Sequence, residues 1–175
     1  RKVGYIYRRH YWKDASNGVK NNYSYSRTKD IMYRFSKRSL ERIEGVNPTL
    51  ITILKEGITD SPYDFGIPRD GGFRTYQRQA ELYARGRTTK ELIEKGITKI
   101  EGRPDKSRIT WTLKSYHMTS NAFDIYAYVN GGASWDMEYL EPIARHLIKV
   151  AAKHGVILSW GYDLWKKDGA HFQIS

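Results

Sequence analysis

Residues 115–129, Ser-Tyr-His-Met-Thr-Ser-Asn-Ala-Phe-Asp-Ile-Tyr-Ala-Tyr-Val, contain the most informative pattern in the chain. From Ala122 to Val129 apolar residues alternate with residues that carry polar groups, as in a strand with one buried face. One face carries Phe123, Ile125, Ala127 and Val129, and the other carries Asp124, Tyr126 and Tyr128. Asn130-Gly131-Gly132 then ends the strand as a turn. The pattern predicts a strand over 122–129 whose polar face carries Asp124.

A second alternating segment adds further chemistry. Along Ala170–Ile174, His171 and Gln173 share the polar face. His117 precedes Asp124 by seven residues, so it can fold over the same face. Two imidazoles and one carboxylate are a common catalytic zinc set, and Asp168 is close enough to His171 to act as general base. The same residues also occur without a metal, with the Asp solvated and each His packed or exposed.

The rest of the chain predicts helices and short strands. Helices are expected over Ser36–Glu44, from Pro48 to Glu56, from the cap Thr75 to Arg85, over Thr89–Lys95, and from Asp136 to about His154. Tyr63–Ile67 and Val156–Trp160 are expected to be short strands. Long helices with scattered short strands indicate an α+β fold, with a small, mostly antiparallel sheet packed against helices.

Composition divides the chain into two parts. It has 175 residues, no cysteine and a net charge of +11, which excludes disulfides and thiolate metal sites and favours an anionic partner. No apolar run reaches the length of a membrane span. Residues 1–30 hold eight Lys or Arg and two Asp. We therefore expect a basic, Tyr-rich extension over residues 1–35 and one domain over 36–175.

Four blocks of sequence resemble one family. Residues 115–124 are similar to the Ser-x-His-x-x-Gly-x-Ala-x-Asp signature of the zinc L-alanyl-D-glutamate peptidases. These are phage endolysins related to D-alanyl-D-alanine carboxypeptidases and dipeptidases, with the hedgehog-like fold. Residues 160–165 resemble the family's Trp-Gly-Gly-Asp-Trp block, and 168–171 its Asp-x-x-His pair. Residues 72–75 and 79–87 resemble its Gly-Tyr-Arg-Ser and Gln-x-x-Leu-Tyr-x-x-Gly-Arg segments.

The resemblance implies roles for individual residues. His117, Asp124 and His171 would bind Zn²⁺, and Asp168 would be the catalytic base. Arg74 would bind the substrate carboxylate or the developing oxyanion. Supporting or substrate-binding roles fall to Ser115, Gln79, Asp163 and Trp160, with Tyr83 and Trp165 as further packing residues. For Ser115 a loop cap, and for Asp163 a purely structural role, remain open.

This chain departs from the family pattern at three positions. Ser120 stands in place of Gly, so the loop after His117 is open to a different backbone angle. Tyr162 replaces the second Gly of the tryptophan block and adds bulk near the site. Gln173 replaces a Glu often found two residues after the last His, which removes a negative charge. None of the three deletes a predicted ligand or the base.

The implied function is hydrolysis of the peptide stem of peptidoglycan between L-Ala and D-Glu, as a phage endolysin. The alternatives are a D,D- or L,D-carboxypeptidase and a non-catalytic, zinc-containing cell-wall binding module. A specific nucleic-acid partner is not expected, because no recognised motif accompanies the charge. Residues 1–30 are candidates for contact with anionic envelope polymers. We expect a monomer that stays in the host cytoplasm until lysis, since the first ten residues lack a signal-peptide core.

Overall fold

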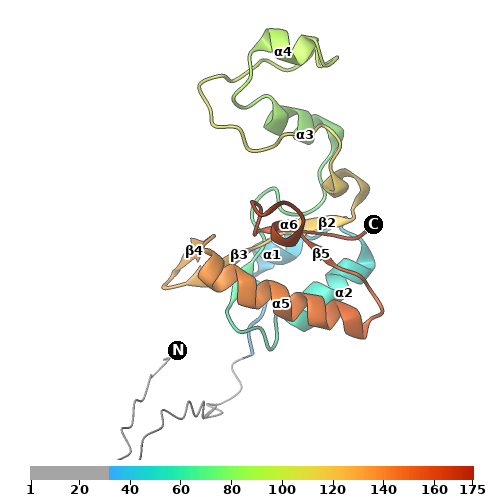
Figure 1. Ribbon diagram of the computed structural model, residues 1–175, viewed down its shortest axis with the longest axis vertical. Helices are drawn as coiled ribbons and strands as arrows, with labels where there is room; N and C mark the ends of the chain where they lie inside the picture. Colours follow the sequence, from blue (N-terminus) through green and yellow to red (C-terminus); the bar gives the residue numbers. More distant parts are fainter. Residues whose placement is uncertain (1–31) are drawn as a thin grey trace, which may run out of the picture.

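The computed structural model describes residues 32–175 (Figure 1). The predicted extension therefore lies almost wholly outside the described residues. Its last residues do contact the rest of the protein: Tyr33 and Phe35 pack against the main core, and the Phe35 ring meets the Phe65 ring edge-on at 5.4 Å. Within residues 32–175, no helix combines the length and apolar character that crossing a membrane requires.

Two helices begin at the predicted caps, Asn47 and Thr75, and two more begin at caps that were not predicted, Ser36 and Thr88. Ser36, Asn47, Thr75 and Thr88 each accept a hydrogen bond from a backbone N–H of the first turn. The helices are α1 (Lys37–Arg42), α2 (Pro48–Gly57), α3 (Tyr76–Tyr83), α4 (Thr89–Ile93), α5 (Met137–Lys153) and α6 (Gly161–Trp165). The predicted ends of the first, third and fourth each lie two residues beyond the observed ends, as is common where helix ends fray. The short helix α6 was not predicted.

Within residues 32–175, six short strands form two antiparallel sheets. One sheet has the order β1-β3-β4 and the other β2-β6-β5. The strands are β1 (Phe65–Gly66), β2 (Ala122–Asp124), β3 (Tyr126–Val129), β4 (Gly132–Ser134), β5 (Ser159–Trp160) and β6 (His171–Gln173). The α+β class with antiparallel pairing is confirmed, although two sheets replace the single predicted one. The turn at Asn130-Gly131, with φ of 51° and 81°, joins β3 to β4 as a hairpin.

The single strand predicted over 122–129 is wrong in one respect. The chain forms two strands, and Ile125 between them crosses from one sheet to the other. Its N–H donates to Ala170 O, while the N–H of Tyr128 donates to Asp64 O in front of β1. Phe123, Ile125 and Ala127 are nevertheless all fully buried. The alternation of side chains continues through the crossing, so the residue pattern alone could not reveal the change of partner.

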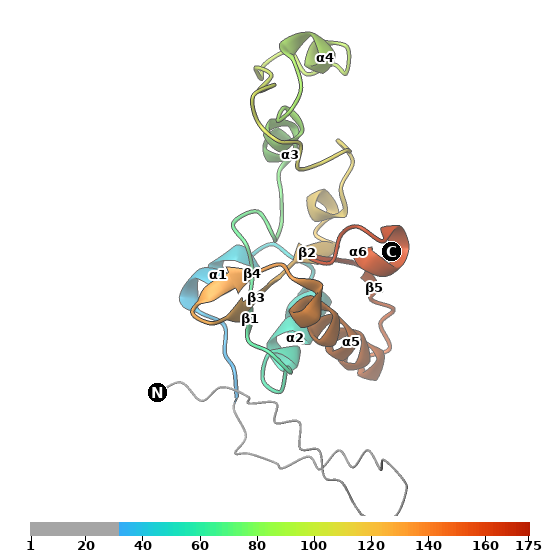
Figure 2. The ribbon, with the colours of Figure 1, turned by 60° about the vertical axis from the view of Figure 1, so that its left-hand side comes forward.

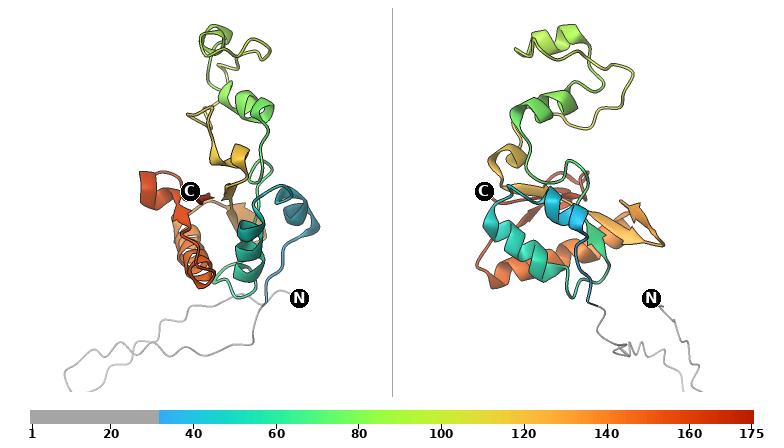
Figure 3. Two further views of the ribbon diagram at one scale, coloured as in Figure 1. Left: turned by 90° about the vertical axis from the view of Figure 1, so that its right-hand side faces the viewer. Right: turned by 180° about the vertical axis from the view of Figure 1, so that it is seen from behind.

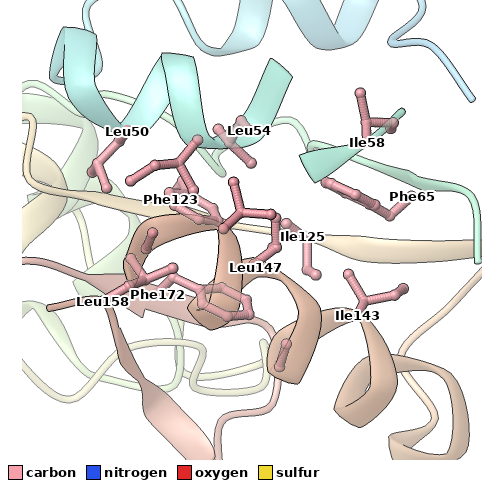
Figure 4. Close-up of a cluster of buried hydrophobic side chains, with 14 of the residues drawn as sticks. Leu50, Leu54, Ile58, Phe65, Phe123, Ile125, Ile143, Leu147, Leu158 and Phe172 are labelled. Carbon is pink, nitrogen blue, oxygen red and sulfur yellow. The ribbon is translucent and has the colours of Figure 1, made fainter. Parts of the chain in front are cut away.

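The main core lies between the strands and the two longest helices. Side chains from α2, α5 and the strands meet there, including Leu50, Leu54, Phe123, Ile125, Ile143, Leu147 and Phe172 (Figure 4). The rings of Phe123 and Phe172 stack at 5.0 Å across the β2–β6 pair. Burial of each such side chain stabilises the fold by about 1.5–3 kcal/mol. This packing holds β2 and β6, which carry Asp124 and His171, in a fixed register.

A second part of the molecule projects from this body. Residues 76–114, called the arm below, contain α3 and α4 and a long return segment, and they extend away from the sheets in every view (Figures 1 and 3). The arm has its own small core, formed by Ala80, Tyr83, Ala84, Leu92 and Ile97. Arg87, itself buried, lies 3.6 Å over the Tyr83 ring and donates to Thr110 O. The body is taken as residues 32–75 and 115–175.

Candidate metal centre

Three predicted ligands converge at the base of the arm. His117, Asp124 and His171 each offer one ligand atom, and these atoms lie within 4.8 Å of one another. Nδ1 of His171 lies 3.0 Å and Nε2 of His117 lies 3.2 Å from Asp124 Oδ1, and the two nitrogens are 3.3 Å apart. Asp124 and His171 are direct partners across the β2–β6 pair. The predicted convergence of the three side chains is therefore present.

His117 is held by a short 3₁₀ helix, η1 (Tyr116–Thr119), that precedes β2. Ser115 caps this helix, because its Oγ accepts from the N–H of His117 at 3.4 Å. The Nδ1–H of the ring donates to Gly72 O at 2.8 Å, which leaves the lone pair of Nε2 facing Asp124 and His171. A side chain at Gly72 would collide with Arg42 O, so only glycine allows the chain to pass this close to Arg42.

The backbone at Ser120 keeps the angle expected of the glycine it replaces. Its φ is 65°, in the left-handed region that residues other than Gly, Asn and Asp rarely occupy. The carbonyl of Ser120 accepts from the N–H of Asn47, and this contact ties the loop to the start of α2. The substitution therefore leaves the loop conformation in place and adds backbone strain of about 1 kcal/mol.

His171 is oriented by Gln173, for which no such role was predicted. Its Nε2–H donates to Oε1 of Gln173 at 3.0 Å, which leaves the lone pair of Nδ1 directed toward Asp124. Gln173 is buried on the same strand face as His171. The shared face was visible in the alternating pattern of 170–174, but Gln173 was interpreted only as the loss of a charge. Metal-binding histidines usually have such an acceptor on the second ring nitrogen.

Arg74 lies against a predicted metal ligand. Its guanidinium donates to Asp124 Oδ2 at 2.6 Å, and its Nε donates to Asp70 O at 2.6 Å. The side chain is only 12 % exposed. A third contact, at 3.4 Å, goes to Oε1 of Gln79, whose own amide donates to Thr110 and Thr112 of the arm. Arg74 is thus a fixed positive charge beside the cluster, and Gln79 connects it to the arm.

Asp168 lies outside the group of three ligands but close to it. Its carboxyl accepts hydrogen bonds from the backbone N–H groups of Ala170 and His171. Partial loss of hydration raises the pKa of this carboxyl, and the negative charge of Asp124 raises it further. The residue as a whole remains exposed. A carboxyl with a raised pKa beside a possible metal site is well suited to accept a proton.

The three ligands differ in their electrostatics. Burial raises the pKa of Asp124, but His117, His171 and Arg74 outweigh that effect, and the net pKa lies well below its ordinary value. For His171, burial lowers the pKa and hydrogen bonding to Asp124 more than reverses this, so the net pKa is raised. Without a metal, Asp124 is therefore ionised and favours the protonated form of the His171 ring.

The remaining predicted residues support the site from a distance. Trp160 is buried, donates from Nε1 to Gly169 O at 2.8 Å, and packs against Phe172. Asp163, on α6, forms an exposed two-oxygen pair with Arg145 at 2.6 and 3.0 Å. Both therefore brace the tryptophan block, and the contacts at Asp163 fit the structural role left open above.

Helix α6, which was not predicted, places the aromatic ring of Trp165 beside the cluster. The Trp165 ring lies 5.6 Å from the His171 ring and is half exposed. Gly161 opens the helix, and a Cβ there would lie 2.6 Å from Asp168 O, so the helix can approach the 168–171 turn closely. Figure 2 shows β2 and α6 together below the arm. Trp165, Asp168 and the cluster thus occupy one side of the body.

The chain is similar to known proteins over most of its length. The family model described as phage L-alanyl-D-glutamate peptidase matches residues 31–174. The L-alanyl-D-glutamate peptidase of Escherichia phage T5 is 28% identical over 138 residues, covering 78% of this chain and 85% of that protein. The crystal structure of the Serratia marcescens L-Ala D-Glu endopeptidase ChiX superimposes with a TM-score of 0.59 at 29% identity, covering 82% of this chain and 91% of that one. The match to the family model, which takes in the ligand cluster and the arm alike, shows that this chain belongs to the phage L-alanyl-D-glutamate peptidases, a family of peptidoglycan endopeptidases.

Proposed function

We propose that the protein hydrolyses the L-Ala–D-Glu bond of the peptidoglycan stem with a zinc ion held by Nε2 of His117, a carboxylate oxygen of Asp124 and Nδ1 of His171. The observation that carries the proposal is the convergence of these atoms while the second nitrogen of each ring is engaged by Gly72 O or Gln173. Two neutral imidazoles and one carboxylate suit zinc and leave a coordination position open. When bound, such an ion lowers the pKa of a water and polarises the peptide carbonyl.

Asp168 is the proposed general base. Its ionised carboxyl accepts a proton from the attacking water as the water oxygen bonds to the carbonyl carbon. The C–N bond then breaks, and the same proton passes from Asp168 to the leaving amine. The backbone N–H groups of Ala170 and His171 hold the carboxyl in place for both transfers. Its raised pKa supports this role, because a stronger base accepts the proton more readily.

Arg74 is the proposed stabiliser of negative charge. Its guanidinium lies 2.6 Å from Asp124 Oδ2, so its positive charge is close to any oxyanion that develops beside the ligands. The contacts to Asp70 O and Gln79 restrict its movement. In the same position Arg74 also orients Asp124 toward the two histidines.

The products of digestion test the proposed bond. We expect purified peptidoglycan treated with the protein to release fragments with a new amino-terminal D-Glu and a new carboxyl-terminal L-Ala, identified by mass spectrometry. A chelator should abolish the release, and added zinc should restore it. Release of a terminal D-Ala instead would indicate a D,D- or L,D-carboxypeptidase. Binding without any new amino group would indicate a non-catalytic module.

A substitution tests the proposed base. Asp168→Ala should lower the cleavage rate by about 10²–10⁴-fold and leave bound zinc unchanged. A matched control is Asp60→Ala, which removes an exposed carboxyl paired with His146, a residue that the proposed mechanism does not use. The control should retain activity. If Asp168→Ala cleaves at the control's rate, the base has been assigned to the wrong residue.

Several finer expectations remain predictions. Contact of residues 1–30 with anionic envelope polymers falls outside the described residues. A monomeric state, and residence in the host cytoplasm until lysis, likewise await measurement. Truncation of residues 1–30 followed by binding to purified envelope polymers would test the first of these, with the wild-type chain as control.

A further inference from the structure

The arm carries all of the surplus positive charge of the described residues. Residues 76–114 hold ten Lys and Arg against five Asp and Glu, a net charge of +5. The body, residues 32–75 and 115–175, holds twelve of each and is neutral. A separation this complete, within one domain of 144 described residues, concentrates the attraction for anions on one projecting element.

Much of this charge is free to bind a partner. Three acidic residues of the arm are neutralised locally, because Glu81 pairs with Arg78, Glu91 with Arg108 and Asp105 with Lys106. Among the described residues, no ion pair within 4.0 Å engages the exposed cations Lys90, Lys95, Lys99, Arg103 and Lys114. These five side chains are therefore open to an external anion.

Hydrogen bonds fix the return segment of the arm, which carries several of these cations, against the end of α3. Gly86 donates to Arg103 O at 2.8 Å, Arg108 Nε donates to Gly86 O at 3.0 Å, and Arg85 Nε donates to Ser107 O at 3.3 Å. These contacts fasten the return segment across the end of α3. The Arg108 guanidinium lies 5.3 Å over the Trp111 ring, and Trp111 is 75 % exposed. The arm thus also carries an exposed aromatic ring next to one of its arginines.

The arm leads directly to the metal cluster. Gln79 of α3 contacts both Thr112 O in the return segment and Arg74, which pairs with Asp124. The return segment continues into η1, which carries His117. The arm stands over the same side of the body as β2 and α6 (Figure 2). A polymer lying along the arm would therefore extend from the site of cleavage.

We propose that the arm docks peptidoglycan at stem peptides next to the one being cleaved, by attraction of its free cations for their carboxylates; the proposal rests on the proposed function for the identity of the polymer. Every stem carries free carboxylates at intervals along the polymer, so a projecting cationic element can hold several at once. The exposed Trp111 ring adds apolar contact. The cations increase the rate on the polymer and leave the chemical step to the body.

Two charge-matched variants test the proposal. The arm variant carries Lys90→Gln, Lys95→Gln, Lys99→Gln and Arg103→Gln. The body variant carries Arg38→Gln, Lys55→Gln, Lys149→Gln and Lys153→Gln, all exposed and on α1, α2 or α5. Both lose the same charge, and Gln is a good helix former. Each is assayed on purified peptidoglycan freed of phosphate polymers and on a soluble muropeptide with one stem.

The arm variant should lose about tenfold in kcat/KM on the polymer at low salt. It should stay within about twofold of wild type on the single-stem muropeptide, as is usual for surface changes. The body variant should stay within about twofold on both. At about 1 M salt the difference between the variants should vanish, because charges are screened beyond a few ångströms.

Three results would overturn the proposal. Equal losses in both variants would mean a nonspecific effect of net charge. An equal loss of the arm variant on both substrates would mean a disturbed active site. A loss that occurs only on walls retaining phosphate polymers would identify those polymers as the partner instead.

Co-sedimentation with peptidoglycan in a chelator separates this proposal from the proposed function. If the wild-type protein, assayed without the chelator, does not cleave the L-Ala–D-Glu bond, the proposed function fails. Weaker sedimentation of the arm variant than of the body variant would still support docking in that case. Equal sedimentation of the two variants contradicts docking whatever the cleavage result.

Discussion

The body and the arm of this protein differ in both packing and charge. The body contains a core of twenty buried apolar residues and no net charge, and it holds the three ligands. The arm contains a core of five buried residues and a net charge of +5. A metal centre needs its ligands held within about 0.5 Å, which a large core can provide. Attraction of a polyanion needs only exposed cations on a stable support, which a small core can provide.

Loss of a ligand should have the largest effect and should be confined to the body. In His117→Ala the remaining ligands are too few for tight binding, so zinc content and cleavage should both fall by at least about a hundredfold. Substitution of residues that only hydrogen-bond to a ligand already costs about 10–100-fold in metal affinity, and loss of a ligand should cost at least as much. His154→Ala, which removes an exposed histidine paired with Glu56, is the matched control. Unchanged zinc content in His117→Ala would show that the ligand set is wrong.

The same core truncation in the two parts should have different consequences. Leu147→Ala in α5 should lower the free energy of unfolding of the whole protein by about 2–5 kcal/mol. Leu92→Ala in α4, equally buried, should instead lower hydrogen-exchange protection within the arm and leave the body protected. Exchange measured by mass spectrometry distinguishes the two patterns. A loss of protection throughout the body in Leu92→Ala would mean that the arm is not an independent packing unit.

Gln173 should influence metal affinity through His171. Gln173→Leu removes the acceptor for the Nε2–H of His171 and should weaken zinc binding by about 10–100-fold. Gln173→Glu retains an acceptor and should bind zinc at least as tightly as wild type. Affinities from competition with a chelating dye test both variants. Equal affinities for Gln173→Leu and wild type would show that this hydrogen bond does not position the ligand.

Acid should weaken metal binding at the body and leave the arm unaffected. The pKa of His171 in the metal-free protein is raised by Asp124, and the metal requires the unprotonated ring. Protons therefore compete with zinc for the His171 ring as the pH falls through this raised pKa, which lies above the ordinary value of 6.5. The zinc affinity should then fall by up to about tenfold per pH unit. Without metal the sign for stability is opposite, since the raised pKa stabilises the fold at low pH and this contribution is lost as pH rises through it. Zinc affinity that is constant between pH 5 and 8, measured by the same competition, would contradict this.

Ser120→Gly should have the smallest effect. The substitution relieves a left-handed backbone angle but adds freedom to the unfolded chain, so the net gain in unfolding free energy should be about 0.5 kcal/mol. Ser120→Val should lower the unfolding free energy by about 1–3 kcal/mol, because a β-branched residue fits this angle poorly. Urea denaturation of the two variants measures both changes. Equal stability of the two variants would exclude backbone strain at this position.

Local sequence patterns predicted the parts of the site that depend on local structure. The alternation around Asp124 and His171 placed both on polar strand faces, and in the structure the two residues are direct partners across the β2–β6 pair. The caps at Asn47 and Thr75 located two helix starts. Spacing showed only that His117 can fold over the same face, and block similarity assigned it as a ligand, because its position depends on the contact of Gly72 O with the ring.

The features that escaped prediction depend on contacts between distant segments. The division of 122–129 into two strands depends on two contacts with distant segments, because the N–H of Ile125 donates to Ala170 O and the N–H of Tyr128 donates to Asp64 O. Helix α6 has five residues, too few for a period of 3.6 to be visible. The arm appeared as two ordinary helices, because its separate core forms only when Ile97 returns to Leu92 and Tyr83.

Reconstitution with zinc tests the central claim most directly. Protein stripped of metal by a chelator should cleave no peptidoglycan, and activity should then rise in proportion to added zinc and level off at one equivalent per chain. In Asp124→Asn, which keeps the side-chain shape but lacks the charge, the same titration should need a large excess of zinc. Full activity in the stripped protein, or identical titrations of wild type and Asp124→Asn, would contradict a zinc centre at His117, Asp124 and His171.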